Sequence, residues 1–262
     1  PWRVERRGPS AGQDIREDVT FNERGEHAYR SAPYYANESP ACTTLAYDAL
    51  DRVVRVTHPD GQGLARAYNL HQVTTTDELG HQQVDVLDVF GRVVEHRELN
   101  GSATEKTAYT YDLRGKLVRV VDPAGNTSTF AYDSLGRKTR ATDPDLGTWT
   151  FEYDAAGQEI AHTDARGIRT QYVHDALGRR VSKTTQPGTA NAVTVQWRYD
   201  EARAGEVNVG RLTGLVDGSG TASYGYDAGG NLVRGTRTVD GVPYTFLKGY
   251  DTGGRLLWTS YP

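Results

Sequence analysis

The segment Phe130-Ala131-Tyr132-Asp133-Ser134-Leu135-Gly136-Arg137 contains a six-residue unit, Tyr-Asp-x-x-Gly-Arg, that recurs along the chain. Clear copies begin at Tyr111, Tyr132 and Tyr153, and a fourth copy begins at His174, where histidine replaces tyrosine. These four starts are 21 residues apart. Because self-similarity at a fixed period is typical of repeat architectures, the chain is predicted to consist of one unit repeated many times.

The repeated residues are interpreted as a structural motif, and no catalytic, cofactor-binding or metal-binding site is expected. An aspartate in the first turn position accepts a hydrogen bond from a backbone N–H two residues on, and glycine takes the left-handed conformation at little cost. At Leu50-Asp51-Arg52 an aspartate replaces this glycine, and aspartate also tolerates that region. The predicted motif residues are Tyr47, Asp48, Tyr111, Asp112, Gly115, Tyr132, Asp133, Gly136, Arg137, Tyr153, Asp154, Gly157, Asp175, Gly178, Arg179, Tyr199, Asp200, Tyr226, Asp227, Tyr250 and Asp251.

A second turn signal lies between the copies, for example at Asp122-Pro123-Ala124-Gly125, so each repeat is predicted to be a hairpin of two strands. Within a strand, aromatic or apolar residues alternate with polar ones. The predicted fold is therefore all-β, with the hairpins forming a long, largely antiparallel sheet. A four-residue loop is favoured for the register, which would place Tyr132 opposite Arg137 and Phe130 opposite Thr139.

Residues 1–44 are predicted to be a non-repeat N-terminal segment that acts as a cap or linker. Residues 45–262 are predicted to form the repeat sheet, which we expect to continue beyond the end of this chain. Within residues 1–44, the stretch 14–22 is a helical candidate, and the Gly-rich stretch 200–221 interrupts the repeats. Because the chain contains no Met, we expect it to be an internal piece of a longer protein.

Charge and composition exclude several classes of function. A net charge of −4 and a pI near 6.0 argue against nucleic acid as a partner, because phosphate binding needs a basic surface. No signal peptide and no membrane-inserting segment are expected, since the chain opens with charged residues and has no apolar run of about 18 residues. Cys42 is the only cysteine, so no internal disulfide is possible, and it is interpreted as an inert packing residue.

The repeat resembles the RHS/YD-repeat family, which includes bacterial Rhs polymorphic toxins and insecticidal toxin-complex B and C subunits. The resemblance rests on Tyr47-Asp48-Ala49-Leu50-Asp51-Arg52 and on residues 130–137, and it extends over residues 45–260. It implies a curved sheet that is part of a spiral β-cocoon around a toxic effector domain. The implied partners are a C-terminal toxin domain of the same or a partner chain, other shell segments and secretion machinery. Secretion or export by a toxin-delivery system is expected.

Three classes of protein other than a shell share some of these features. A cell-surface or glycan-binding adhesion module stays open, because aromatic-rich β-surfaces can bind glycans, although regularly spaced aromatics are more often packing residues. An enzyme is not expected, since the seven histidines show no HExxH spacing and no GxSxG or P-loop sequence occurs. A calcium β-roll is disfavoured, because the GGxGxD nonapeptides that it requires are missing.

Overall fold

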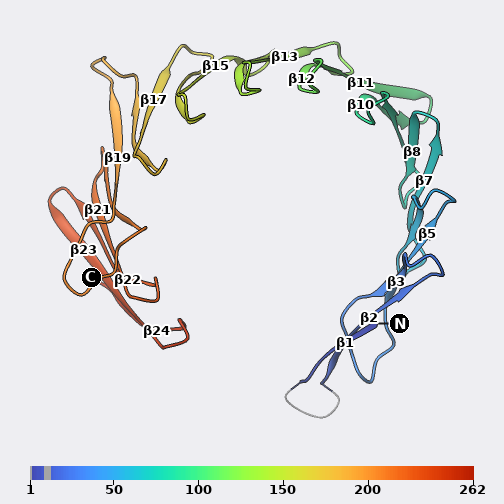
Figure 1. Cartoon of the computed structure of the whole chain (residues 1–262), viewed down its shortest axis with the longest axis horizontal. Coiled ribbons are helices and arrows are strands. Elements are labelled where there is room, and N and C mark those ends of the chain that lie inside the picture. Colours follow the sequence, from blue (N-terminus) through green and yellow to red (C-terminus); the bar gives the residue numbers. More distant parts are fainter. Residues whose placement is uncertain (1, 9–12) are drawn as a thin grey trace. The chain divides into compact units, whose positions relative to one another are not determined.

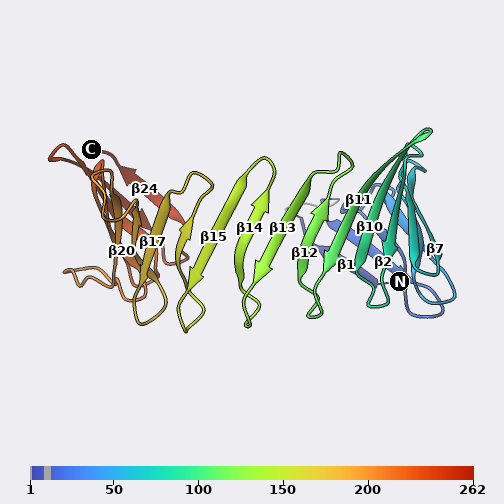
Figure 2. The same cartoon turned by 90° about the horizontal axis from the view of Figure 1, so that it is seen from above.

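The computed structural model describes residues 2–8 and 13–262. Every regular element in this part of the chain is a β-strand, which confirms the predicted all-β class. The chain divides into two compact units, Pro1–Thr127 and Ser128–Pro262. Within each unit, all paired strands are antiparallel, and Figure 2 shows such strands side by side, for example β13 to β15 of the second unit.

The described residues of the first unit form twelve strands, of which most pair with their neighbours in chain order (Figure 1). The exceptions lie near the N-terminus, where β2 pairs with β4 as well as with its neighbours β1 and β3, and β3 also pairs with β5. The strands are β1 (Trp2–Arg6), β2 (Ile15–Phe21), β3 (His27–Ser31), β4 (Tyr34–Tyr35), β5 (Cys42–Tyr47), β6 (Val53–Thr57), β7 (Gly63–Asn69), β8 (Gln72–Thr76), β9 (Gln82–Leu87), β10 (Val93–Asn100), β11 (Ala103–Tyr111) and β12 (Leu117–Val121).

The second unit is a simple meander in which each strand pairs with the next one along the chain. Its strands are β13 (Thr127–Tyr132), β14 (Lys138–Asp143), β15 (Gly147–Tyr153), β16 (Glu159–Thr163), β17 (Arg169–His174), β18 (Arg180–Thr185), β19 (Val193–Tyr199), β20 (Leu212–Asp217), β21 (Gly220–Tyr226), β22 (Leu232–Val239), β23 (Val242–Tyr250) and β24 (Leu256–Ser260). Because every pair of strands is consecutive in the chain, each turn is a hairpin connection, as the repeat predicts.

The predicted turn positions are confirmed, but the predicted register is wrong. The backbone N–H of Asp133 donates to the carbonyl of Arg137 at 2.9 Å, so the loop contains three residues and not four. The register then shifts, with Tyr132 opposite Lys138 and Phe130 opposite Ala141. Thr139 is the extra residue of a β-bulge, which the alternation of faces alone does not reveal.

The N-terminal segment also differs from expectation. The stretch 14–22, a helical candidate, forms β2 instead, because pairing with β1 and β3 satisfies its backbone groups. At the end of β2, Asn22 repeats the turn chemistry of the motif: its side-chain oxygen accepts from the backbone N–H groups of Arg24 and Glu26, each at 3.0 Å. A copy of the turn therefore occurs inside residues 1–44, with Phe21 and Asn22 in place of Tyr and Asp.

Each unit is a single layer of sheet with little buried apolar surface of its own. Among the described residues, the buried apolar side chains are Tyr34, Val84, Ala161 and Ala222. Soluble domains normally pack two layers against each other to bury an apolar face. The strands here are consequently held mainly by the backbone ladder and by side-chain contacts between neighbouring hairpins.

A buried carboxylate fastens β1 to β2 and β4. Arg3 donates from Nε and Nη2 to the two carboxylate oxygens of Asp18, at 2.6 and 2.9 Å, and the hydroxyl of Tyr34 donates to Asp18 at 2.7 Å. The bonds from Arg3, followed by the bond from Tyr34, lower the pKa of Asp18 to about 2. A lowered carboxylate pKa stabilises the folded state at neutral pH, and that contribution is lost as the pH falls through the lowered value.

We therefore expect the amides of β1 to lose protection from hydrogen exchange as the pH falls from about 4 to about 2. The matched variant is Asp18→Asn, which removes the titrating group. At pH 6 the wild type should protect residues 2–6 better than the variant, and near pH 2 the difference should disappear. A difference that is the same at both pH values would contradict the assignment of this carboxylate.

Candidate functional site

The Tyr-Asp turns form the most regular set of polar side chains in the structure, and each is built around its aspartate. In the turn at Asp133, one carboxylate oxygen accepts from the backbone N–H groups of Leu135 and Arg137, both at 2.9 Å. The other oxygen accepts from Nε of Arg137 at 2.7 Å. Gly136 closes the turn at a φ of 78°, where a side chain would be strained.

Similar bonds lower the pKa of the aspartate in several other turns. Hydrogen bonds from Arg52 lower the pKa of Asp48, and hydrogen bonds from Arg179 lower the pKa of Asp175. At Asp227 the residue after the glycine is Asn231, whose side chain and backbone N–H lower the pKa of that carboxyl. These carboxylates are ionised and already saturated with donors, which suits turn formation and not acid–base chemistry.

In five turns the arginine after the turn reaches the tyrosine of the following repeat. Within the first unit, the guanidinium carbon of Arg52 lies 4.1 Å from the ring centre of Tyr68, and that of Arg92 lies 4.7 Å from Tyr111. In the second unit the pairs are Arg137 with Tyr153 at 4.9 Å, Arg179 with Tyr199 at 4.4 Å and Arg211 with Tyr226 at 5.4 Å. Arg52, Arg92, Arg137 and Arg179 are also paired with the aspartates of their own turns, so each of these four joins its aspartate to the next hairpin through a cation–π contact.

The tyrosine hydroxyls complete the link between repeats. Tyr153 donates to the backbone carbonyl of Lys138 at 2.9 Å, and Lys138 stands opposite Tyr132 at the bulge of the preceding hairpin. The equivalent donors and acceptors are Tyr47 to His27, Tyr68 to Val53, Tyr111 to Val93, Tyr199 to Arg180 and Tyr226 to Leu212. Every acceptor lies at a bulge, where the regular ladder is interrupted, so the tyrosine satisfies a carbonyl there.

The structure places all the predicted motif residues at hairpin turns or at the strand ends beside them. It does not gather them into one pocket, because each serves its own repeat. The prediction missed three features: the turn at Asn22, the arginine–tyrosine stacking between repeats, and the role of Gly210 and Arg211. The turn at Asn22 could have been found from the sequence, since Phe21-Asn22-x-x-Gly25 differs from the motif only by similar residues. A degenerate copy at Tyr68-Asn69 instead forms a tight turn in which Asn69 is opposite Gln72.

Gly210 and Arg211 complete the turn of Asp200 across an insertion. The backbone N–H of Asp200 donates to the carbonyl of Arg211 at 3.1 Å, and Gly210 donates to the Asp200 carboxylate at 2.6 Å. Residues 201–209, here called the insert, therefore lie inside a Tyr-Asp turn, which explains why this repeat is longer than 21 residues. The insert is fastened to the neighbouring strands, for example by the bond of 2.7 Å between Arg234 and Glu206.

The inter-repeat contacts are absent at the step that leads to His174. His174 occupies a tyrosine position and Gln158 occupies the preceding arginine position. Nδ1 of His174 is buried without a hydrogen-bond partner. The imidazole therefore leaves a polar atom unsatisfied at a position where tyrosine would donate to a bulge carbonyl, here that of Glu159.

We expect His174→Tyr to stabilise the second unit by about 1 kcal/mol, because it replaces an unsatisfied nitrogen with a hydroxyl that can reach the Glu159 carbonyl. The complementary variant is Tyr153→Phe, which removes an existing bond from a tyrosine hydroxyl to a bulge carbonyl and should destabilise the unit by a similar amount. Chemical denaturation of both variants measures the two effects. A destabilised His174→Tyr variant would show that the site does not accept the common geometry.

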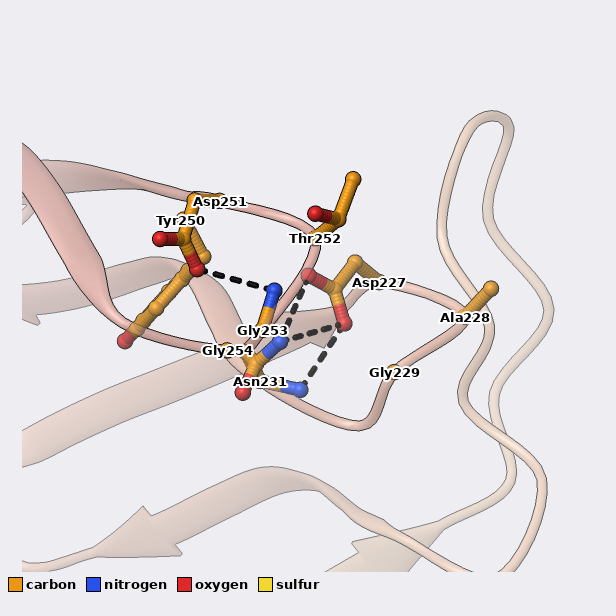
Figure 3. A pocket seen from close by; sticks show the side chains of 9 residues that line it. All are labelled: Asp227, Ala228, Gly229, Asn231, Tyr250, Asp251, Thr252, Gly253 and Gly254. Carbon is orange, nitrogen blue, oxygen red and sulfur yellow. Dashed lines mark hydrogen bonds between the residues drawn. The ribbon is translucent and has the colours of Figure 1, made fainter.

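A depression in the second unit lies between two adjacent turns (Figure 3). It is lined by residues 227–229, 231 and 250–254 and has a volume of about 710 Å³. The Asp227 carboxylate accepts from Asn231, and the Asp251 carboxylate accepts from the backbone N–H of Gly253 at 2.9 Å. Both acids are thus engaged by their own turns. Within residues 2–8 and 13–262, no group of three or more His, Cys, Asp or Glu side chains is arranged to hold a metal ion.

The geometry defines a class of protein, a β-sheet of repeated hairpins joined by Tyr–Arg–Asp contacts. Residues 111–148 and 153–190 match the family model described as RHS Repeat. These two segments therefore resemble RHS repeats, and the predicted resemblance to the RHS/YD-repeat family is confirmed. No curated protein sequence matches the chain.

Several solved structures of toxin complexes share the fold. The crystal structure of TcdB2-TccC3 superposes with a TM-score of 0.81 and 15% identity over 99% of this chain, and 16% of that chain is covered. TcdB2-TccC3 without its hypervariable C-terminal region gives 0.82 and 16% identity over 96% of this chain and 15% of the other. A Tc holotoxin pore of Photorhabdus luminescens gives 0.80 and 16% identity over 95% of this chain and 15% of the other. This chain thus spans about a sixth of each matched chain.

Proposed function

We propose that this chain is a structural segment of an RHS-repeat shell that encapsulates a toxic effector domain for delivery. The observation that carries the proposal is the set of Tyr–carbonyl and Arg–Tyr contacts, which join several hairpins to the next and use the polar side chains of the motif for that purpose. A single-layer sheet whose hairpins are joined in this way is suited to form the wall of a shell, that is, a continuous layer that separates the inside from the solvent. The RHS Repeat match and the fold shared with Tc toxin structures support the same role.

The proposed partners follow from the role of the chain as part of a shell. They are a toxin domain, C-terminal in the same chain or carried by a partner chain, together with other shell segments and secretion machinery. Export by a toxin-delivery system is part of the proposal. Among the described residues, none belongs to a helix long and apolar enough to span a bilayer. We propose that the segment itself has no enzymatic activity and needs no cofactor, because its repeated carboxylates are bound by their own turns.

Protease protection tests the encapsulation. The full-length protein, with any chain that assembles with it, is treated with a non-specific protease, and peptides from the effector region are followed by mass spectrometry. We expect the effector to be cleaved much more slowly than the same domain expressed alone. A variant with a weakened wall, Gly220→Val, should lose part of this protection.

An effector cleaved as fast as the free domain would contradict encapsulation. Binding of the chain to a glycan array, with competition by the free sugar, would then favour the adhesion module instead.

A further inference from the structure

Hairpin turns alternate along the two edges of the first unit (Figure 2). The two edges differ in the polarity of their exposed side chains. The edge that carries the Tyr-Asp turns, here called the YD rim, exposes one or two apolar side chains at each of four successive turns. These side chains are Leu50, Leu70, Val89, Phe90 and Leu113, with exposed fractions of 72%, 95%, 81%, 79% and 108%. The four turns of the opposite edge expose one comparable side chain, Leu79. Isolated exposed leucines are ordinary, but a row confined to one edge indicates a contact surface.

Leu70 provides a second, independent observation. Its φ of 49° lies in the left-handed region, which leucine rarely adopts and which Asn, Asp or Gly would occupy at lower cost. Leucine at this position therefore contributes neither to the turn conformation nor to packing within the unit, since it is almost fully exposed. A role outside the unit accounts for it.

We propose that the YD rim of the first unit associates with the same rim of a second copy of this chain. Successive turns on one edge are two strands apart, or about 9.6 Å. Two copies of the rim share this spacing, so the tips of one can lie between the tips of the other about a twofold axis, as in isologous dimers.

The charges beside the tips and the surface area that the contact would bury both agree with a second copy of the chain bound at the YD rim. Ionised groups beside the tips are paired, Asp48 with Arg52, Asp88 with Arg92, and Asp51 with an arginine of the neighbouring turn, so these groups do not make two rims repel each other. Burying five such side chains removes roughly 500 Å² from water per copy, which gives roughly 1,000 Å² for a pair. This area is near the lower limit for a specific interface, and a weak, reversible dimer is expected. The proposal is independent of whether the chain forms a toxin shell.

Sedimentation equilibrium of the chain, over on the order of a hundredfold range of concentration, tests the proposal. The average mass of the wild type should rise from that of a monomer towards that of a dimer. Leu70→Asp combined with Phe90→Asp should raise the dissociation constant at least about tenfold, because carboxylates would then face each other across the axis. The matched control on the opposite edge, Leu79→Asp combined with Ala124→Asp, should behave as the wild type.

The variants are expected to fold, since the changed side chains are exposed and aspartate tolerates the left-handed conformation at residue 70. Circular dichroism that matches the wild type verifies this. A wild type that stays monomeric at the highest concentration overturns the proposal. So does a dimer that the rim variant leaves intact, which would assign association to another surface. Flotation of a monomeric chain with phosphatidylcholine vesicles, lost in the rim variant, would show that the row contacts lipid instead.

Discussion

Replacing Gly220 with valine is expected to lower the free energy of unfolding of the second unit by about 2–4 kcal/mol. Gly220 begins β21 at a φ of 132°, a conformation that residues with a side chain rarely adopt. A Cβ atom there would lie 2.0 Å from the backbone carbonyl oxygen of Thr238 on β22. Because that oxygen belongs to the backbone of a paired strand, the clash cannot be relieved by a change of rotamer.

Gly218, two residues earlier in the same turn, is the matched control. A Cβ atom at Gly218 meets nothing within 4 Å, and its φ is not positive. Gly218→Val should therefore change the free energy of unfolding by only about 0.5 kcal/mol. Chemical denaturation of the two variants compares them directly. Equal losses of stability would mean that the close approach of β21 and β22 does not constrain Gly220.

Replacing Thr213 with valine is expected to cost about 1–3 kcal/mol, although the two side chains have nearly the same shape. Thr213 is fully buried, with 0% of its surface exposed. Its hydroxyl donates to the carbonyl of Arg198 at 3.1 Å and accepts from the backbone N–H of Glu201 at 3.4 Å. Valine would leave both backbone groups without this partner and would free the first residue of the insert.

Thr213→Ser is the comparison variant, because it keeps the hydroxyl and loses only a methyl group, at a cost of about 1 kcal/mol. Valine should destabilise more than serine, and hydrogen exchange of residues 201–209 should quicken in the valine variant alone. If serine is the more destabilising change, packing of the methyl group, and not the hydrogen bonds, holds the insert in place.

Sequence patterns predicted the turns well because turn chemistry is local. The aspartate bonds and the left-handed glycine of the turn at Asp133 lie within five consecutive residues. The same reasoning held at Asp51, which adopts a φ of 60° in place of glycine. The interpretation of the first 44 residues was poorer, since Phe21 and Asn22 were not recognised as equivalents of Tyr and Asp, and an isolated stretch gave no period to compare with.

The sequence by itself determined that this chain is all-β, where its hairpins turn, and that its aspartates build turns, since these properties depend on residues close together in the chain. Only the tertiary structure decided the bulge at Thr139, the bonds of Tyr153 and Arg137 across neighbouring hairpins, and the packing of the insert over its strands. The contacts between hairpins join residues that are 14 or more apart, so they depend on how the backbone of one hairpin meets the next. Pairing between strands fixes that geometry, and side-chain periodicity alone does not specify it.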